Sequence, residues 1–112
     1  MFNRTPRPAY CPWGAIQEAT EVLDGIWLLS TASHGGFHVS QERLDASEFL
    51  KEWTYLSFNR QGTGGWFEED CDWCFIPLAF SDEWKAARGE RGEEEIKEAK
   101  RTFDQWIAPK AA

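Results

Sequence analysis

The residue types best suited to metal chemistry fall in two short segments. His34 and His38 are separated by three residues, and Cys71 and Cys74 form a C-x-x-C pair. Two imidazoles and two thiolates can hold zinc tetrahedrally, which makes this set a candidate zinc site. The order is reversed relative to a zinc finger, and the C-x-x-C pair is also a weak match to a redox motif. The alternative, which we favour, is that no cofactor is bound and both cysteines are small core residues.

A second candidate combines a histidine with carboxylates. His34 lies beside two glycines, where a turn would let its side chain face a pocket, and Glu68, Glu69, Asp70 and Asp72 lie close together in the chain. Such groups could supply a general base or a site for a hard metal ion. Consecutive acids cannot all face one site, so at most two would act together. The alternative is that the acids begin a helix and the histidine bonds to the turn backbone.

The charge balance limits the partners. Nineteen acidic and 12 basic residues give a net charge of −7. DNA, RNA and anionic membranes would be repelled, so we expect no direct nucleic-acid or membrane binding. A basic protein surface, such as the nucleic-acid groove of another protein, would be attracted. The alternative is that the charge only keeps the chain in solution.

Aromatic residues are the candidate anchors of such a partner. Seven tryptophans are more than 112 residues easily bury, and an exposed tryptophan is a common anchor at interfaces. We expect Trp66 or Trp84 to be exposed beside acidic side chains. The residues predicted to bind the partner are Trp66, Glu68, Glu69, Asp70, Asp72, Trp84, Glu93, Glu94 and Glu95.

The N-terminal half must position His34. Residues 1–12, which hold three prolines, predict a flexible arm ahead of a single α+β domain over residues 13–112. Residues 15–39 predict an antiparallel meander of about three strands, since Asp24-Gly25 is a strong hairpin signal. Three to four helices would pack on this small sheet.

The helices are expected in the second half. Ser40 reads as an N-cap of a helix that restarts near residue 45 or 47 and extends to about 57, before a loop over 59–65. The three acids at 68–70 favour a helix start, with a strand over 73–76 as the alternative, and Pro77 would end or kink that helix.

The clearest helix is predicted over 92–108. It follows a helical turn at 81–84 that Gly89 and Gly92 interrupt, and Pro109 would mark its end.

The sequence predicts neither a membrane-spanning segment nor a signal peptide. No apolar stretch is long enough to cross a membrane, and the first 12 residues have no apolar region typical of a signal peptide. Three cysteines are few and odd in number, which favours a reducing compartment. We therefore expect a cytoplasmic protein.

Four motifs carry a family resemblance. They are Trp13-Gly14, STASHGGF over 30–37, SQERL over 40–44 and GWFEEDCDW over 65–73. Together they resemble a family of small uncharacterised proteins, encoded in phages, plasmids and integrated elements of proteobacteria, that carry only a domain-of-unknown-function label. The resemblance covers roughly residues 13–84. It implies a genomic setting and a bacterial host cell but no activity, and it weighs against zinc because relatives do not consistently have His and Cys at the positions of His38 and Cys74.

Two functions from different classes follow as expectations. The first is a non-enzymatic binding protein of a phage or mobile element that inhibits a host defence complex in the manner of an anti-CRISPR protein. Its acidic surface would imitate DNA and occupy the basic groove of that host complex. The alternative is a small metal- or His/carboxylate-dependent enzyme centred on His34 with Glu68, Glu69 or Asp70. A structural or regulatory role, including a homodimer, is a third expectation.

Overall fold

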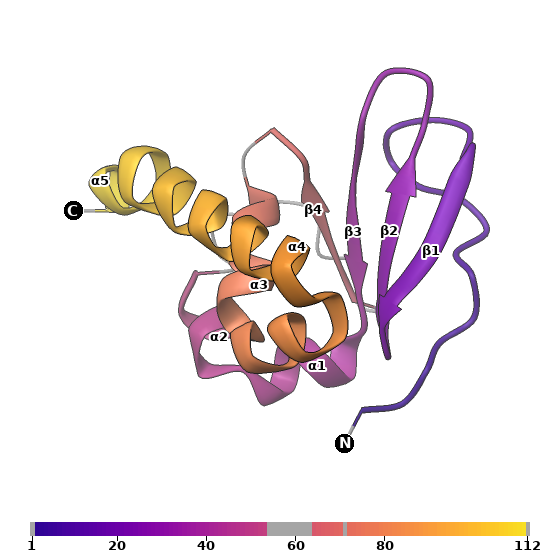
Figure 1. Cartoon of the computed structure of the whole chain (residues 1–112). Helices are drawn as coiled ribbons and strands as arrows, with labels where there is room; N and C mark the ends of the chain where they lie inside the picture. The colour runs from indigo at the N-terminus through magenta and orange to yellow at the C-terminus, as the bar shows by residue number, and fades with distance from the viewer. Residues whose placement is uncertain (1, 54–63, 71, 112) are drawn as a thin grey trace.

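The computed structural model describes residues 2–53, 64–70 and 72–111 of the chain (Figure 1). The strands within these residues are β1 (Glu18–Leu23), β2 (Ile26–Ser30), β3 (Gly35–Val39) and β4 (Gly65–Glu68). The helical elements are α1 (Gln41–Ala46), α2 (Glu48–Trp53), the 3₁₀ turn η2 (Asp72–Cys74), α3 (Phe75–Ala79), α4 (Ser81–Thr102), the π-helical turn η3 (Phe103–Ile107) and α5 (Ala108–Ala111). No helix among the described residues is both long and apolar enough to cross a membrane.

In the described part of the chain, four strands form one antiparallel sheet in the order β1-β2-β3-β4. The predicted α+β class and N-terminal meander are confirmed, and Asp24-Gly25 turns the first hairpin with Gly25 at φ +84°. The fourth strand was not expected, because the acids at 68–70 suggested a helix start. Phe67 pairs with Phe37 and Trp66 with His38, so the aromatic residues before those acids decide the local structure.

One face of the sheet packs against the helices, which Figure 1 shows on one side of the strands. Ile26, Phe37 and Phe67 point to this side and are buried together with Phe75 and Trp84 of the helical half. Each fully buried large side chain of this kind contributes roughly 1.5–3 kcal/mol to folding. The helices therefore hold β3 and β4 firmly, and those two strands carry much of the candidate site.

The other face of the sheet contacts the N-terminal arm. The indole N–H of Trp27 donates to Thr5 Oγ1 at 3.0 Å, and the backbone N–H of Thr5 donates to Glu21 at 3.0 Å. Trp13 meets Trp66 edge to face, with ring centroids 5.7 Å apart. These contacts cover the face that alternates with the core positions. The flexibility expected of residues 1–12 stays a prediction.

A buried arginine joins the arm, the sheet and the helices. Arg43 of α1 is fully buried, and its guanidinium donates to both carboxylate oxygens of Glu83 at 3.0 and 2.6 Å. Its Nε donates to the carbonyl oxygen of Asp24 at 2.6 Å. The rings of Phe2 and Phe80 lie 4.1 and 4.7 Å from the guanidinium carbon. The hydrogen bonds from Arg43 lower the pKa of Glu83.

The caps of α1 and α2 agree with the sequence. Ser40 Oγ accepts the backbone N–H of Arg43 at 3.3 Å, and Ser47 Oγ accepts that of Leu50 at 3.1 Å. The predicted continuation of this helix to residue 57 and most of the loop over 59–65 lie outside the described residues.

The helix favoured after the acids is present, although it begins later, as η2 and α3, and the alternative of a strand over 73–76 is therefore wrong. Pro77 lies in the first turn of α3, where its missing N–H leaves no hydrogen bond unmade.

The long helix α4 is interrupted as predicted at Gly89, which has φ 60° and ψ −136°. The interruption that was also predicted at Gly92 is wrong, because Gly92 is buried within the continuing helix. The helix predicted over 92–108 is present, although residues 103–107 adopt π-helical geometry. Pro109 was expected to lie beyond the last helix, which is wrong, because it lies inside α5.

Candidate functional site

A groove of about 760 Å³ lies between the β1–β2 hairpin and the middle of α4. The apolar residues that line it are Leu28, Leu29, Phe37 and Trp73, of which Leu29 is 1% exposed and points to the other side of the sheet. Its charged surface comes from five glutamates and one arginine, namely Glu18, Glu69, Glu94, Glu95, Glu98 and Arg91. A groove of this composition favours a ligand that carries both positive charge and an apolar portion.

The strand register explains the open side of the groove. Leu28 pairs with Phe37 and with Thr20, so all three point to the same side of the sheet. Phe37 is buried under Trp84, but Leu28 keeps 39% of its surface exposed. An aliphatic side chain on the core side of a sheet that stays this exposed marks the place where the helices no longer cover the strands.

One glutamate of the groove belongs to an internal network. Arg88 donates to both carboxylate oxygens of Glu95 at 2.7 and 3.0 Å, and the indole N–H of Trp84 donates to the same carboxylate at 3.0 Å. Burial raises the pKa of Glu95, but the hydrogen bonds from Arg88 and Trp84 and the charge of Arg91 outweigh it and lower that pKa. Glu95 thus ties α4 together across the interruption at Gly89.

The other α4 glutamates of the groove are held more loosely. Glu94 pairs with Lys97 at 3.5 Å and Glu98 pairs with Arg101. These four side chains are more than half exposed, and exposed ion pairs contribute only about 0–1 kcal/mol. Glu94 and Glu98 are therefore able to exchange their partners for a ligand at little cost.

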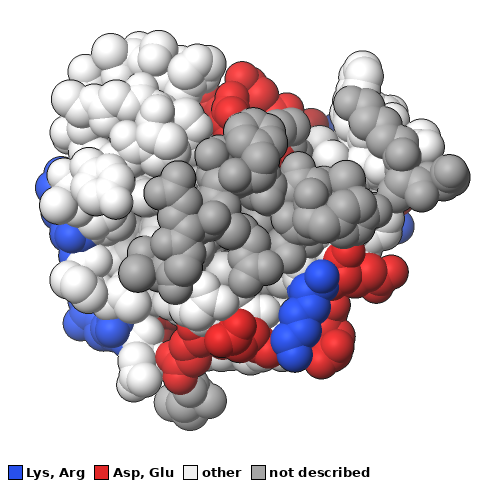
Figure 2. Space-filling model, turned by 180° about the vertical axis from the view of Figure 1, so that it is seen from behind, with Lys and Arg blue, Asp and Glu red and all other residues white. Residues whose placement is uncertain are grey.

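The molecule seen from behind the view of Figure 1 carries charges of both signs. Figure 2 shows acidic patches at the upper and lower edges, with basic side chains on the left and between acidic ones at the lower right. Basic and acidic side chains thus adjoin in one part of that view, whereas the groove combines five glutamates with a single arginine.

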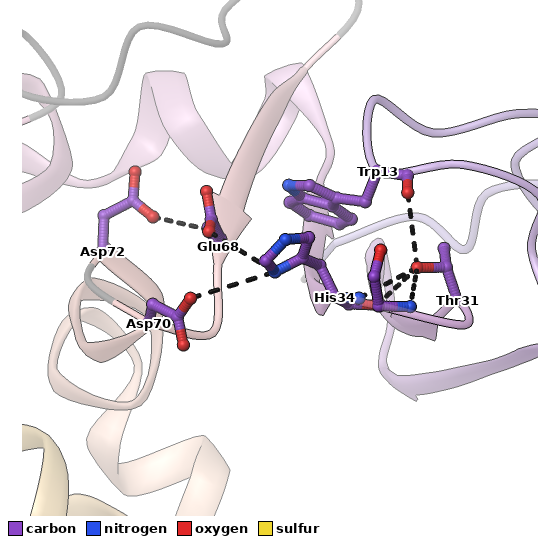
Figure 3. Close-up of polar contacts among 7 residues, drawn as sticks. Trp13, Thr31, His34, Glu68, Asp70 and Asp72 are labelled. Carbon is purple, nitrogen blue, oxygen red and sulfur yellow. Dashed lines mark hydrogen bonds and ion pairs between the residues drawn. The ribbon is translucent and has the colours of Figure 1, made fainter.

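A second cluster of chemical interest lies at the β2–β3 turn, at the end of the sheet where Ser30, Gly36 and Glu69 also line the groove (Figure 3). His34 Nδ1 lies 3.9 Å from Glu68 Oε1 and 3.9 Å from Asp70 Oδ2. One potential ligand atom from each residue lies within 4.8 Å of the others. The His34 side chain is 46% exposed and Glu68 is 27% exposed, so the cluster is open to solvent on one side.

Short-range hydrogen bonds position both halves of this cluster. Thr31 closes the β2–β3 turn, because its hydroxyl donates to the carbonyl oxygen of His34 at 2.8 Å and accepts the backbone N–H of His34 at 3.1 Å. The backbone N–H of Glu68 on β4 donates to the buried carboxylate of Asp72 in η2 at 2.5 Å. Figure 3 draws these three hydrogen bonds as dashed lines.

Gly36 lets the two halves approach one another. It is the cross-strand partner of Glu68. A Cβ at Gly36 would lie 2.2 Å from the carbonyl oxygen of Phe67 and 2.7 Å from the ring of Trp13. Only glycine fits between strand β4 and the Trp13 indole at this position.

The predicted binding residues lie in different environments. Glu69, Glu94 and Glu95 line the groove, whereas Glu68 and Asp70 face His34. Trp66 is half-buried against Trp13. Trp84 was expected to be an exposed anchor, which is wrong: it is 1% exposed, because Phe37 packs on it and Glu95 accepts its N–H.

The residues of the zinc hypothesis are also dispersed where the structure describes them. Cys74 is fully buried in the core, and the ring of His38 lies 4.5 Å from that of Trp66 on the arm-facing side of the sheet. His34 lies with Glu68 and Asp70 instead. Cys71 lies outside the described residues, so zinc binding by the full set stays a prediction.

Sequence reasoning missed several residues of the groove. Glu18, Leu28 and Trp73 were not singled out. For Leu28 and Glu18 the signal was the alternation along the hairpin, which places residues two apart on one face.

Comparison with known proteins identifies the family of the chain but no individual relative. No curated protein and no solved structure matches the chain. The model of the family described as Domain of unknown function (DUF7007) matches residues 6–111, which is nearly the whole sequence. The chain therefore belongs to the DUF7007 family.

Proposed function

We propose that this chain is a non-enzymatic binding protein whose groove takes a basic, partly apolar segment of a partner protein. The observation that carries the proposal is the concentration of five glutamates around an apolar floor. A bare cation would not need Leu28 and Phe37, and an apolar ligand would not need the carboxylates. A Lys- or Arg-containing peptide segment satisfies both requirements, because its stems are apolar and its ends are charged.

The size of the groove is consistent with a segment of a few residues. Its volume of about 760 Å³ lies within the range of roughly 300–1,000 Å³ that is typical of ligand sites. The surrounding net charge of −7 would speed the approach of a basic partner and would repel nucleic acid.

The finer form of the proposal concerns the identity of the partner. A basic segment that normally contacts phosphates is the natural target of a carboxylate-lined groove, because both ligands present arrays of negative oxygens. On this proposal the protein inhibits a nucleic-acid-binding host complex, in the manner of an anti-CRISPR protein encoded by a phage or mobile element. The charge of the groove supports the inhibitor role, and the encoding element is proposed from the resemblance that the sequence motifs imply.

The groove is tested with a defined probe. A fluorescent peptide of alternating Arg and Leu is titrated with the full-length protein at low and at high salt. We expect the double variant Glu94→Gln/Glu98→Gln to bind at least tenfold more weakly, with a reduced dependence on salt. Glu93→Gln is the matched control, because Glu93 is exposed on the same helix but does not line the groove. Equal losses in both variants would contradict the proposal.

The host partner is tested separately. Tagged protein is used to capture complexes from its native bacterium, and nucleic acid is then added as a competitor. Release of a nucleic-acid-binding complex by the competitor, and no capture by the double variant, is the expected result. Capture that is insensitive to nucleic acid would contradict the inhibitor form of the proposal and leave the peptide result unaffected.

The geometry of His34 favours a second candidate, a small His/carboxylate-dependent enzyme. An imidazole within 3.9 Å of two carboxylates could exchange protons with a bound substrate. Loss of a catalysed reaction in His34→Ala with the fold intact would support this candidate, and peptide binding in the groove would be unchanged by it.

A further inference from the structure

The geometry points to a site for one divalent first-row transition metal ion at His34, Glu68 and Asp70. This site is separate from the groove and does not depend on the proposed function. Its ligands would be the Nδ1 atom of His34 and one carboxylate oxygen from each acid, and water would fill the remaining positions. The donor set excludes neither zinc nor manganese, since imidazole suits the former and carboxylate the latter.

The donor atoms are already near the required spacing. Two ligands bound at about 2.1 Å with a tetrahedral angle lie roughly 3.4 Å apart. His34 Nδ1 lies 3.9 Å from Glu68 Oε1 and 3.9 Å from Asp70 Oδ2. For these two pairs a movement of a few tenths of an ångström at each side chain closes the difference, and all three donor atoms lie within 4.8 Å of one another.

The charges of the cluster favour a bound cation. Two carboxylates this close repel each other, and the separations of 3.9 Å are too long for direct hydrogen bonds from the imidazole. The geometry therefore leaves a space between three donor atoms instead of a closed ion pair. In contrast, the ion pairs that stabilise the core of this protein have separations of 2.6–3.0 Å.

Hydrogen bonds to the backbone hold two of the proposed ligands in position. Thr31 fixes the backbone on both sides of the His34 Cα, and Asp72 holds the backbone of Glu68. Hydrogen bonds of this kind orient the ligands of metal sites and tune their affinity. The ligands come from the β2–β3 turn and from β4 with its following turn, so the ion would join two segments 34 residues apart in the chain.

The test uses the full-length protein after removal of metal by a chelator. Co²⁺ is added and its visible d–d absorption is followed, and Zn²⁺ is then titrated in competition. We expect one equivalent of Co²⁺ to bind, with quenching of the tryptophan fluorescence, because Trp13 lies beside His34 in Figure 3 and Trp66 packs against Trp13. Because the ligands are nitrogen and oxygen, no thiolate charge-transfer band should appear in the near ultraviolet.

Two variants and one control assign the site. His34→Ala and Asp70→Asn are each expected to weaken binding by roughly tenfold to a hundredfold or more, by analogy with the effect of weaker second-shell changes. Glu69→Gln is the matched control, because it neutralises the intervening carboxylate, which lines the groove. It should bind metal normally but the basic peptide more weakly, so that failure of the metal site and failure of the groove are distinguishable.

The outcomes that overturn the inference are equally defined. Absence of stoichiometric binding, or binding that both ligand variants leave unchanged, would overturn it. A thiolate charge-transfer band would do the same, because it would assign the ion to a cysteine-containing set. Circular dichroism of each variant confirms that a loss of affinity is not a loss of fold.

Discussion

The Arg43–Glu83 cluster and the His34–Glu68–Asp70 cluster both join distant segments through charged side chains, but they do so in opposite ways. Arg43 is fully buried, bonded to both oxygens of one carboxylate and covered by two phenylalanine rings. His34 is half-exposed and lies 3.9 Å from each of its two acids. In the first cluster every distance is that of a completed contact, and in the second both separations are longer than a hydrogen bond.

This difference separates stability from binding. A charge that the protein itself satisfies contributes to folding, and its removal leaves an uncompensated partner. Charges that the protein gathers without satisfying them contribute little to folding and remain available to a ligand. The following predictions test this separation, beginning with the enclosed cluster.

The largest loss is expected from Arg43→Ala. It removes a bidentate ion pair, a contact with the Asp24 carbonyl and packing between two rings, which together should lower the free energy of unfolding by about 3 kcal/mol. Urea denaturation followed by circular dichroism measures the change. Arg43→Lys should give an intermediate value, because it keeps the charge but not the fork of donors. A smaller loss of unfolding free energy than in the exposed control Lys51→Ala would show that the Arg43 cluster does not stabilise the fold.

A smaller loss is expected from Gly36→Ala. The new methyl group would meet the Phe67 carbonyl at 2.2 Å, so β4 must shift, at a cost of about 2 kcal/mol. Because the shift moves Glu68 away from His34, this variant should also lose Co²⁺ binding. The control is Ala32→Gly in the neighbouring turn, where the side chain is exposed. Normal metal affinity in Gly36→Ala would show that strand spacing does not position the cluster.

Glu95 is expected to stabilise the fold less than Arg43 and more than His34. Its contribution can be tested by lowering the pH. Its folded-state pKa is below the usual 4.5, so its contribution is fully present above about pH 4.5 and is lost as the pH falls through the lowered value. Glu95→Gln should cost about 1 kcal/mol at neutral pH. The variant should also lose less stability between neutral and acidic pH than the unmodified protein. Parallel stability curves for the two proteins over this range would contradict the assignment.

The smallest change in stability is expected from His34→Ala. With no completed ion pair to break, the free energy of unfolding should change by no more than about 0.5 kcal/mol. The same urea titration as for Arg43→Ala measures it. A loss above 1.5 kcal/mol would show that the open cluster is a structural ion pair, and the comparison with Arg43 would then fail.

The sequence predicted the elements better than the sites. Asp24-Gly25, the Ser40 cap and the interruption at Gly89 act locally, and each has the predicted effect. Strand β4 was missed because its pairing with β3 depends on residues far away in the chain. The groove depends on where α4 crosses the β1–β2 hairpin, which no local pattern records. Trp84 illustrates the same limit: composition indicated surplus tryptophans, but only packing decides which are buried.

The strand order has a kinetic consequence. Strands β1, β2 and β3 join through short turns, so their pairing closes only small loops. Pairing of β4 with β3 must close a loop of 25 residues between Val39 and Gly65 and carries a larger entropic barrier. The His34 and Glu68 side chains therefore meet late in folding. If the chain refolds in the presence of Co²⁺, the d–d absorption of the bound ion should appear only when β4 pairs with β3. The time course of that absorption would therefore measure the rate of this pairing.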